Sequence, residues 1–227
     1  MKTLTMIKIY LTAIALAVST FVLGQKFKRF FGSLEYKITV EDTSFASLYP
    51  DSRMVIYTND TIVRMENQTS SLGSQVTIRH TEKQKAYQLL NTEFGKFAIQ
   101  ANLSNNSDSV KNSSKYIFHK TCKGEKRLGK KAIMYEVEHE AYKDKKNFLF
   151  FKKYSNKYIN TFNEVPYLPV VYYVITQDVI LKYELVSISE YIPHRDLFGI
   201  PTDFEKVTFD EFLDKYLEFK GQKKSQE

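Results

Sequence analysis

The side chains that could do acid–base or nucleophilic chemistry are few in this sequence. It has four histidines and one cysteine. It has none of the short motifs that position a catalytic serine, a zinc-bound water or a nucleotide phosphate, such as Gly-x-Ser-x-Gly, His-Glu-x-x-His, a Walker loop or Gly-x-Gly-x-x-Gly. The sequence therefore predicts that the protein is not an enzyme and that it uses no cofactor.

One pair of residues has the spacing of metal ligands. His119 and Cys122 form a His-x-x-Cys pattern in a segment that reads as a strand, where side chains three positions apart point to opposite faces. They could bind one ion together only if a turn intervened, so no metal site is predicted. Since a lone cysteine cannot form an internal disulfide, we expect Cys122 to be a small buried apolar residue.

The N-terminus has the pattern of a secretory signal peptide. Two lysines flank an apolar, charge-free run over residues 9–23, and Val22 and Gly24 fit the two recognition positions of a signal peptidase. The alternative is a membrane anchor, but the run is shorter than the roughly 20 residues that span a bilayer. We predict cleavage after Gly24 and a mature chain from Gln25 that is neither lipidated nor transmembrane. It would reside in the periplasm or at the periphery of the outer membrane.

Charged residues form two patterns. Glu136, Glu138 and Glu140 alternate along a predicted strand and are interpreted as a solvated face. The net charge is +7, and lysines crowd the neighbouring segments 111–131 and 143–153. Export argues against nucleic acid as the partner of this basic patch. Two alternatives remain: the patch attracts anionic lipids or acidic proteins of the envelope, or its lysines keep edge strands soluble.

Alternation of apolar and polar residues dominates the mature chain, as in strands with one face in a core. In the first such segment, 33–41, one face carries Leu34, Tyr36 and Ile38. We predict a mainly β, single domain over residues 25–227, an antiparallel meander curved into a half-barrel. Tight turns are expected at 59–60, 72–73 and 177–178, and a flexible polar loop at 102–114. The further strands are expected at 53–57, 61–66, 75–79, 85–90, 96–100, 116–123, 131–138, 147–154, 170–176 and 179–190.

One amphipathic helix is predicted over residues 209–219. Thr208 and Glu211 form a capping box at its start, and Gly221 follows its end. Because a curved sheet needs a cover, we expect the apolar stripe of this helix to pack on the concave face of the sheet. The stripe consists of Phe209, Phe212, Leu213, Tyr216 and Leu217.

Four segments carry a resemblance to known proteins. They are 32–38 (Gly-Ser-Leu-Glu-Tyr-Lys-Ile), 126–132 (Lys-Arg-Leu-Gly-Lys-Lys-Ala), 179–185 (Val-Ile-Leu-Lys-Tyr-Glu-Leu) and 200–204 (Ile-Pro-Thr-Asp-Phe). In this order, over nearly the whole mature chain, they resemble the GLPGLI-type exported proteins of Gram-negative bacteria and, beyond them, the lipoprotein-carrier (LolA/LolB-like) half-barrel. The family's name motif is degraded here to Val-Pro-Tyr-Leu-Pro-Val at 165–170. The resemblance implies that the concave sheet face binds acyl chains.

The segment 165–175 is apolar at nearly every position, too continuous for a strand with one wet face. Either both of its faces are buried in the core, or it forms an exposed apolar lip, because Pro166 and Pro169 disturb regular pairing. In the second case a ligand would enter here. The candidate ligand-binding residues are Tyr167, Leu168, Val170 and Tyr172.

Two short segments have the pattern Asp-Ser/Thr-aliphatic, which signals O-glycosylation in some envelope proteins. They are Asp60-Thr61-Ile62 and Asp108-Ser109-Val110, both at predicted loops or strand starts. Matches this short are common by chance, so their modification is a hypothesis that an intact mass would test.

The leading functional hypothesis is an exported envelope protein that binds or carries an apolar or lipid-like ligand in its half-barrel. The alternative is a non-enzymatic protein-interaction or assembly module of the envelope, with the sheet plugged by its own helix and an envelope protein as partner. A monomer is expected in either case.

Overall fold

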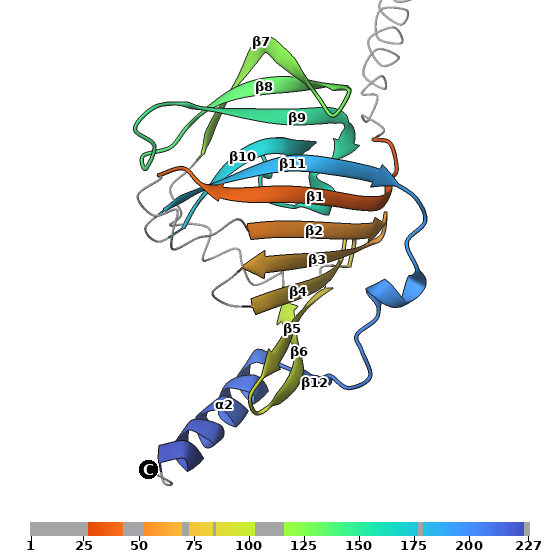
Figure 1. Ribbon diagram of the computed structural model, residues 1–227, viewed down its shortest axis with the longest axis vertical. Coiled ribbons are helices and arrows are strands. Elements are labelled where there is room, and N and C mark those ends of the chain that lie inside the picture. Colours follow the sequence, from red (N-terminus) through yellow and green to blue (C-terminus); the bar gives the residue numbers. More distant parts are fainter. Residues whose placement is uncertain are drawn as a thin grey trace, which may run out of the picture.

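The computed structural model describes residues 27–42, 52–69, 73–83, 85–102, 116–176 and 179–224, and these form one 12-stranded sheet with helical segments around it (Figure 1). The described helices are the 3-10 helices η4 (Asn156–Tyr158) and η5 (Arg195–Phe198) and the α-helix α2 (Phe209–Lys224). The strands are β1 (Phe31–Val40), β2 (Ser52–Asn59), β3 (Ile62–Thr69), β4 (Gly73–His80), β5 (Lys85–Thr92), β6 (Gly95–Asn102), β7 (Ile117–Arg127), β8 (Lys130–Glu138), β9 (Lys146–Ser155), β10 (Tyr167–Ile175), β11 (Ile180–Glu190) and β12 (Glu205–Val207).

The sheet is open and curved, and it confirms the predicted mainly β fold. Its strand order is β12-β6-β5-β4-β3-β2-β1-β11-β10-β9-β8-β7, and every neighbouring pair is antiparallel except β12 with β6. The single predicted meander is in fact two, β1–β6 and β7–β11, joined where β1 pairs with β11. Each predicted strand is present, and β12, with three residues, is too short for alternation to reveal it.

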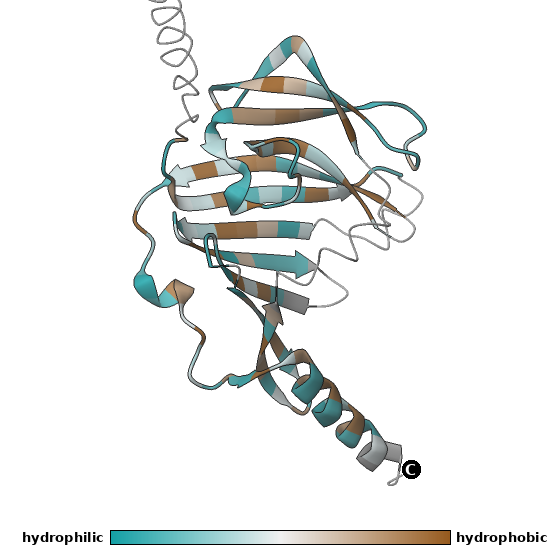
Figure 2. Ribbon diagram, turned by 180° about the vertical axis from the view of Figure 1, so that it is seen from behind, coloured by the Kyte–Doolittle hydropathy of each residue, from teal (hydrophilic) through white to brown (hydrophobic). Residues whose placement is uncertain are grey.

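The main core lies on one face of the sheet, which we name the inner face. In β1 this face carries Leu34 and Tyr36, both fully buried. The loop 156–166, between β9 and β10, covers it with aromatic side chains: the Phe162 ring centroid is 5.8 Å from that of Tyr172 and 5.4 Å from that of Phe148. Seen from behind, this loop lies in front of the strands (Figure 2).

Helix α2 starts where the sequence predicts. The Thr208 N–H donates to the Glu211 carboxylate over 2.7 Å, and the Glu211 N–H donates to Thr208 Oγ1 over 3.2 Å, which completes the capping box. The helix runs to Lys224 and so passes the predicted end at residue 219.

The predicted position of this helix is wrong. It projects from the β6 end of the sheet (Figure 1), and its ring contacts are with the β5–β6 hairpin, where Phe212 lies 5.9 Å from Phe94 and 5.4 Å from Phe97. The rest of the stripe is largely exposed, with Phe209 at 61% and Leu217 at 57%. Over the main core the inner face needs no helix, because the loop 156–166 already fills it there.

The expected burial of Cys122 is also wrong, because its side chain is exposed. It lies in β7, at the edge of the sheet, where the pairing register with β8 shifts between Lys120 and Gly124. The prediction rested on the usual burial of a free cysteine, which an irregular edge strand does not provide.

Several predicted features lie outside the described residues. These are the signal peptide at 1–24, most of the polar loop at 102–114, the turn at 177–178 and the segment Asp108-Ser109-Val110. The predicted turn at 59–60 is confirmed, and its second residue, Asp60, has φ 72°.

The placement of α2 can be tested with two substitutions on the same helix. Phe212→Ala removes a ring that packs on Phe94 and Phe97, so the free energy of unfolding should fall by about 1–3 kcal/mol. Leu217→Ala should change it by less than about 0.5 kcal/mol, since this residue is mostly exposed. Urea unfolding measures both. A loss for Leu217→Ala as large as that for Phe212→Ala would show that the stripe is buried after all.

Candidate functional site

The four residues predicted to bind a ligand lie in β10, and three of them are in the core. Leu168 and Val170 are 0% exposed and Tyr172 is 2% exposed, with the Tyr172 ring stacked at 4.7 Å on that of Tyr183. Tyr167 is half-buried, its ring centroid 6.3 Å from that of Phe27. Both faces of this strand are therefore buried along 168–172, which is the first of the two alternatives that the sequence left open, and no open lip is formed there.

The prolines of this segment are accommodated without a lip. The register between β10 and β9 shifts on both sides of Leu168 and Pro169, and the Pro169 carbonyl accepts a hydrogen bond from the buried Tyr36 hydroxyl over 2.7 Å. A ligand could reach Leu168, Val170 or Tyr172 only if the core opened.

A pocket of about 370 Å³ lies on the opposite, outer face of the sheet. Strands β3, β4 and β5 supply its apolar floor, and the segment 191–204, which links β11 to β12 and which we name the outer strap, supplies its apolar cover. Basic side chains form its rim. The lining residues are Ile62, Ile78 and Tyr87 of the floor, Phe198 and Ile200 of the cover, and His80, Lys83, Lys85 and Lys206 of the rim.

This pocket exists because the apolar side chains of β3 and β4 do not all point to the inner face of the sheet. In β3, Val63 is buried in the main core, whereas its neighbour Ile62 faces outward. In β4, Arg79 reaches the inner side, where its guanidinium donates to the Lys157 carbonyl over 2.6 Å, so Ile78 must point outward. The outer face of β3–β6 thus carries a second, smaller core around Ile78, Leu89 and Ala98, which the outer strap covers with Ile200 and Phe204.

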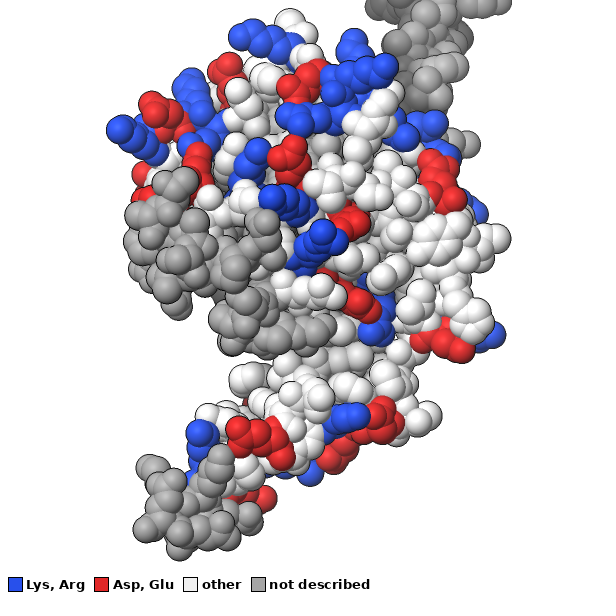
Figure 3. All heavy atoms as spheres, viewed as in Figure 1, with Lys and Arg blue, Asp and Glu red and all other residues white. Residues whose placement is uncertain are grey.

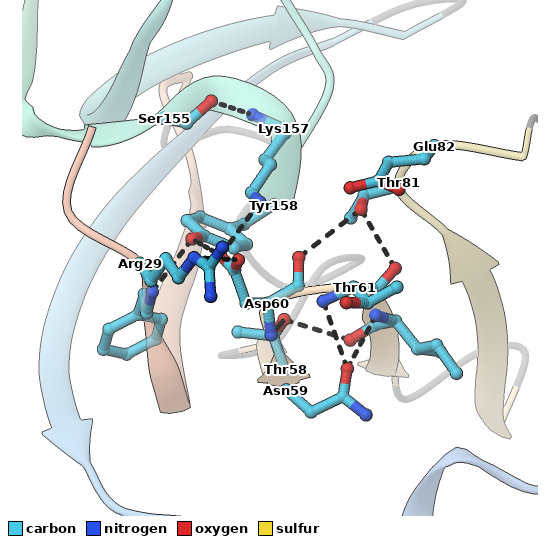
Figure 4. A network of polar contacts seen from close by, with 12 residues as sticks. Arg29, Thr58, Asn59, Asp60, Thr61, Thr81, Glu82, Ser155, Lys157 and Tyr158 are labelled. Atoms are coloured by element: carbon cyan, nitrogen blue, oxygen red, sulfur yellow. Dashed lines mark hydrogen bonds and ion pairs between the residues drawn. The ribbon is translucent and has the colours of Figure 1, made fainter. Parts of the chain in front are cut away.

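The carboxylate of Asp60, on the inner side of the sheet, fixes the position of the β2–β3 turn. Asp60 accepts hydrogen bonds from the Tyr158 hydroxyl over 2.5 Å and from Lys157 Nζ over 2.8 Å, and the Phe30 N–H donates to the Tyr158 hydroxyl over 3.0 Å (Figure 4). These contacts tie the β2–β3 turn to η4 and to the start of β1. The same turn is tied to the end of β4 by a hydrogen bond of 2.8 Å from the Thr81 N–H to the Thr61 carbonyl.

The Asp60 contacts change its acidity. Burial opposes ionisation, but the hydrogen bonds from Lys157 and Tyr158 outweigh it and lower the pKa of the Asp60 carboxyl. Burial and the nearby carboxylate raise the pKa of the Tyr158 hydroxyl. At neutral pH the Asp60 carboxylate is therefore charged and accepts the hydrogen bond, and the Tyr158 hydroxyl is protonated and donates it.

Thr61, the residue that would be modified in the first predicted glycosylation segment, is exposed on this turn.

The described parts of the basic segments, 116–131 and 143–153, lie at the other end of the molecule. Lysine and arginine side chains gather over β7–β9, with acidic side chains between them (Figure 3). Arg127 Nη1 is 2.8 Å from a Glu184 oxygen, and Lys145 Nζ is 2.7 Å from a Glu138 oxygen. His119 also pairs with Glu138, at 3.1 Å. In the described part of the chain, no three His, Cys, Asp or Glu side chains come together as metal ligands would.

No protein-family profile matches the chain, and no curated protein matches it. None of the helices in the described ranges is long and apolar enough to cross a membrane. The resemblance to GLPGLI-type proteins and to lipoprotein carriers accordingly stays a prediction.

The residues of the outer pocket are not among those predicted from the sequence to form a site. Ile62 and Val63 are adjacent apolar residues at a strand start, and Phe198, Ile200 and Phe204 are apolar residues in a segment without regular alternation. Both patterns indicate burial on a second face. They are detectable, but they do not say which strands the outer strap would meet.

The Asp60 network predicts a pH-dependent contribution to stability. A carboxyl whose pKa is lowered by folding stabilises the protein above its unfolded pKa of about 4, and this stabilisation is lost as the pH falls through the folded pKa. Asp60→Asn, which tolerates the positive φ, should lower the free energy of unfolding by about 1–3 kcal/mol at neutral pH. The difference from the wild type should shrink on acidification toward about pH 3. Urea unfolding across this range measures it, and a difference independent of pH would contradict the ionised network.

Proposed function

We propose that this protein is an exported, non-enzymatic binding protein of the cell envelope that holds an apolar or lipid-like molecule in the outer pocket. The single observation that carries the proposal is a pocket of about 370 Å³ with five apolar lining residues on a sheet whose inner face is filled. Ligand pockets of proteins commonly measure roughly 300–1,000 Å³ and are mostly apolar with a few polar groups. Export rests on the signal-peptide pattern of residues 1–24.

The proposed site differs from the one that the carrier resemblance implies. There the concave face would hold acyl chains, but here Tyr158, Ile159 and Phe162 pack into the inner face and occupy it. The outer pocket is open. Of its apolar lining residues, Ile62, Tyr87 and Ile200 are half-buried and Ile78 and Phe198 are buried, whereas its three lysines are exposed. An aliphatic chain entering it would gain about 0.8 kcal/mol for each CH₂ that it buries.

The alternative function, a protein-interaction or assembly module, would use a different surface. The outward stripe of α2 exposes Phe209, Leu213 and Leu217 at 61%, 40% and 57%. This stripe contributes no residue to the outer pocket. Substitutions in α2 therefore separate the two functions, because the ligand-binding function predicts that they leave ligand affinity unchanged.

Filling the pocket tests the proposed function. Ile200→Trp places a larger side chain at the half-buried cover and should weaken binding of the apolar dye Nile red by about tenfold or more, because the ring occupies the ligand's volume. Ile200→Ala enlarges the pocket and should retain binding. Ile117→Trp, on the exposed edge strand β7, is the matched control and should leave the dye affinity unchanged. Fluorescence titration measures all three.

Thermal unfolding of each variant shows whether the fold survives the substitution. Equal dye affinity in the folded Ile200→Trp and wild-type proteins would contradict the outer pocket as the binding site. Absence of any saturable Nile red binding by the wild type would contradict the function itself.

A further inference from the structure

We propose that the ligand of the outer pocket is an amphiphile with one anionic group, its aliphatic tail held by the apolar floor and its anionic head by the lysine rim. This inference rests on the proposed function and adds the charge of the ligand to it. The shared chemistry of the head is a carboxylate or a phosphate, and the experiment below separates a head on a tail from a free anion.

The rim carries three lysines from two separate parts of the chain. Lys83 lies in the β4–β5 turn, Lys85 begins β5, and Lys206 lies in β12, which follows the outer strap. All three are exposed, and no acidic side chain is among the residues that line the pocket in the described part of the chain. An apolar ligand without a charge would leave these ammonium groups without a counterion in the site.

Two acidic side chains of the strap and β12 pair with lysines outside the pocket. Asp203 pairs with Lys96 at 2.8 Å, and Glu205 pairs with Lys215 at 3.3 Å. Lys206 lies opposite Ala98, which belongs to the outer core, whereas the next residue, Val207, packs inward. The alternation of β12 thus presents a lysine to the pocket and keeps Glu205 off that face.

His80 adds a hydrogen-bond donor to the rim. Its Nδ1 accepts the N–H groups of Glu82 and Lys83 over 3.2 Å each, so the ring proton is on Nε2. The same hydrogen bonds fix the turn that presents Lys83. An anionic oxygen at this rim could accept hydrogen bonds from both ammonium and imidazole groups. Such hydrogen bonds to an anion are stronger than hydrogen bonds to a neutral hydroxyl.

The positive charge of the rim also determines which amphiphiles bind poorly. A cationic head would meet three like charges, and a neutral head would gain only the apolar contacts. Because the lysines are exposed, each adds only a modest attraction to an anionic head, and salt should reduce it.

Displacement of Nile red by amphiphiles of equal tail length tests the inference. On the wild type, dodecanoate and dodecyl phosphate should compete about tenfold better than dodecanol, and dodecylamine should compete least. The advantage of the anions should shrink as the salt concentration rises. Inorganic phosphate, which has no tail, should not displace the dye.

The rim residues are tested in the same assay. The variant Lys83→Gln/Lys85→Gln/Lys206→Gln should bind dodecanol as the wild type does and lose the preference for the anions. The control Lys120→Gln/Lys123→Gln/Lys126→Gln removes the same charge from exposed positions of β7 and should keep the preference.

The outcomes separate the inference from the function on which it rests. Equal competition by dodecanoate and dodecanol on the wild type would overturn the anionic head and leave the apolar site standing. The same would follow if the control lost the preference as fully as the rim variant, because the effect would then come from net charge. Displacement by inorganic phosphate would overturn the amphiphile, because the site would then bind a free anion without a tail. No displacement by any amphiphile would overturn the proposed function itself.

Discussion

The packing of the loop 156–166 on the inner face is the interaction on which the rest of the structure depends. Tyr158, Ile159 and Phe162 bury themselves against strands from both meanders, and Phe162 lies within ring-contact distance of Phe148 and Tyr172. Since interiors are closely packed, this loop leaves no room there for α2 or for an acyl chain. The site that we propose for an apolar ligand is on the outer face, where the sheet passes from its main core to its smaller one.

The two-faced burial of the sheet follows from its length. A curved sheet of 12 strands cannot place all of its apolar side chains on one side of a single core. At β3 the sequence supplies both Val63 for the inner face and Ile62 for the outer face, and from β4 onward the outer core around Ile78 needs its own cover. The outer strap provides that cover with Ile200 and Phe204. The pocket lies where this cover ends in the lysine rim.

The sequence predicts those parts of the fold that short-range patterns determine. Alternation located the strands that became β1–β11, and the capping box located the start of α2, because both depend on neighbours within a few residues. The pairing of β1 with β11, the cover supplied by 156–166 and the position of α2 depend on contacts between distant segments, so they could not be read locally. The candidate residues of β10 illustrate this limit, since a continuous apolar run fits both a buried strand and an exposed lip, and only the strands on either side decide between them.

The central claim, that an apolar ligand occupies the outer pocket and not the inner face, is tested most directly by methyl NMR of isoleucine-labelled protein during titration with dodecanoate. The δ1-methyl signals of Ile62, Ile78 and Ile200, which line the pocket, should shift in a saturable manner. Those of Ile38, Ile56 and Ile159, which are buried in the main core, should remain in place. Shifts confined to the main-core isoleucines would contradict the account and return the ligand to the inner face.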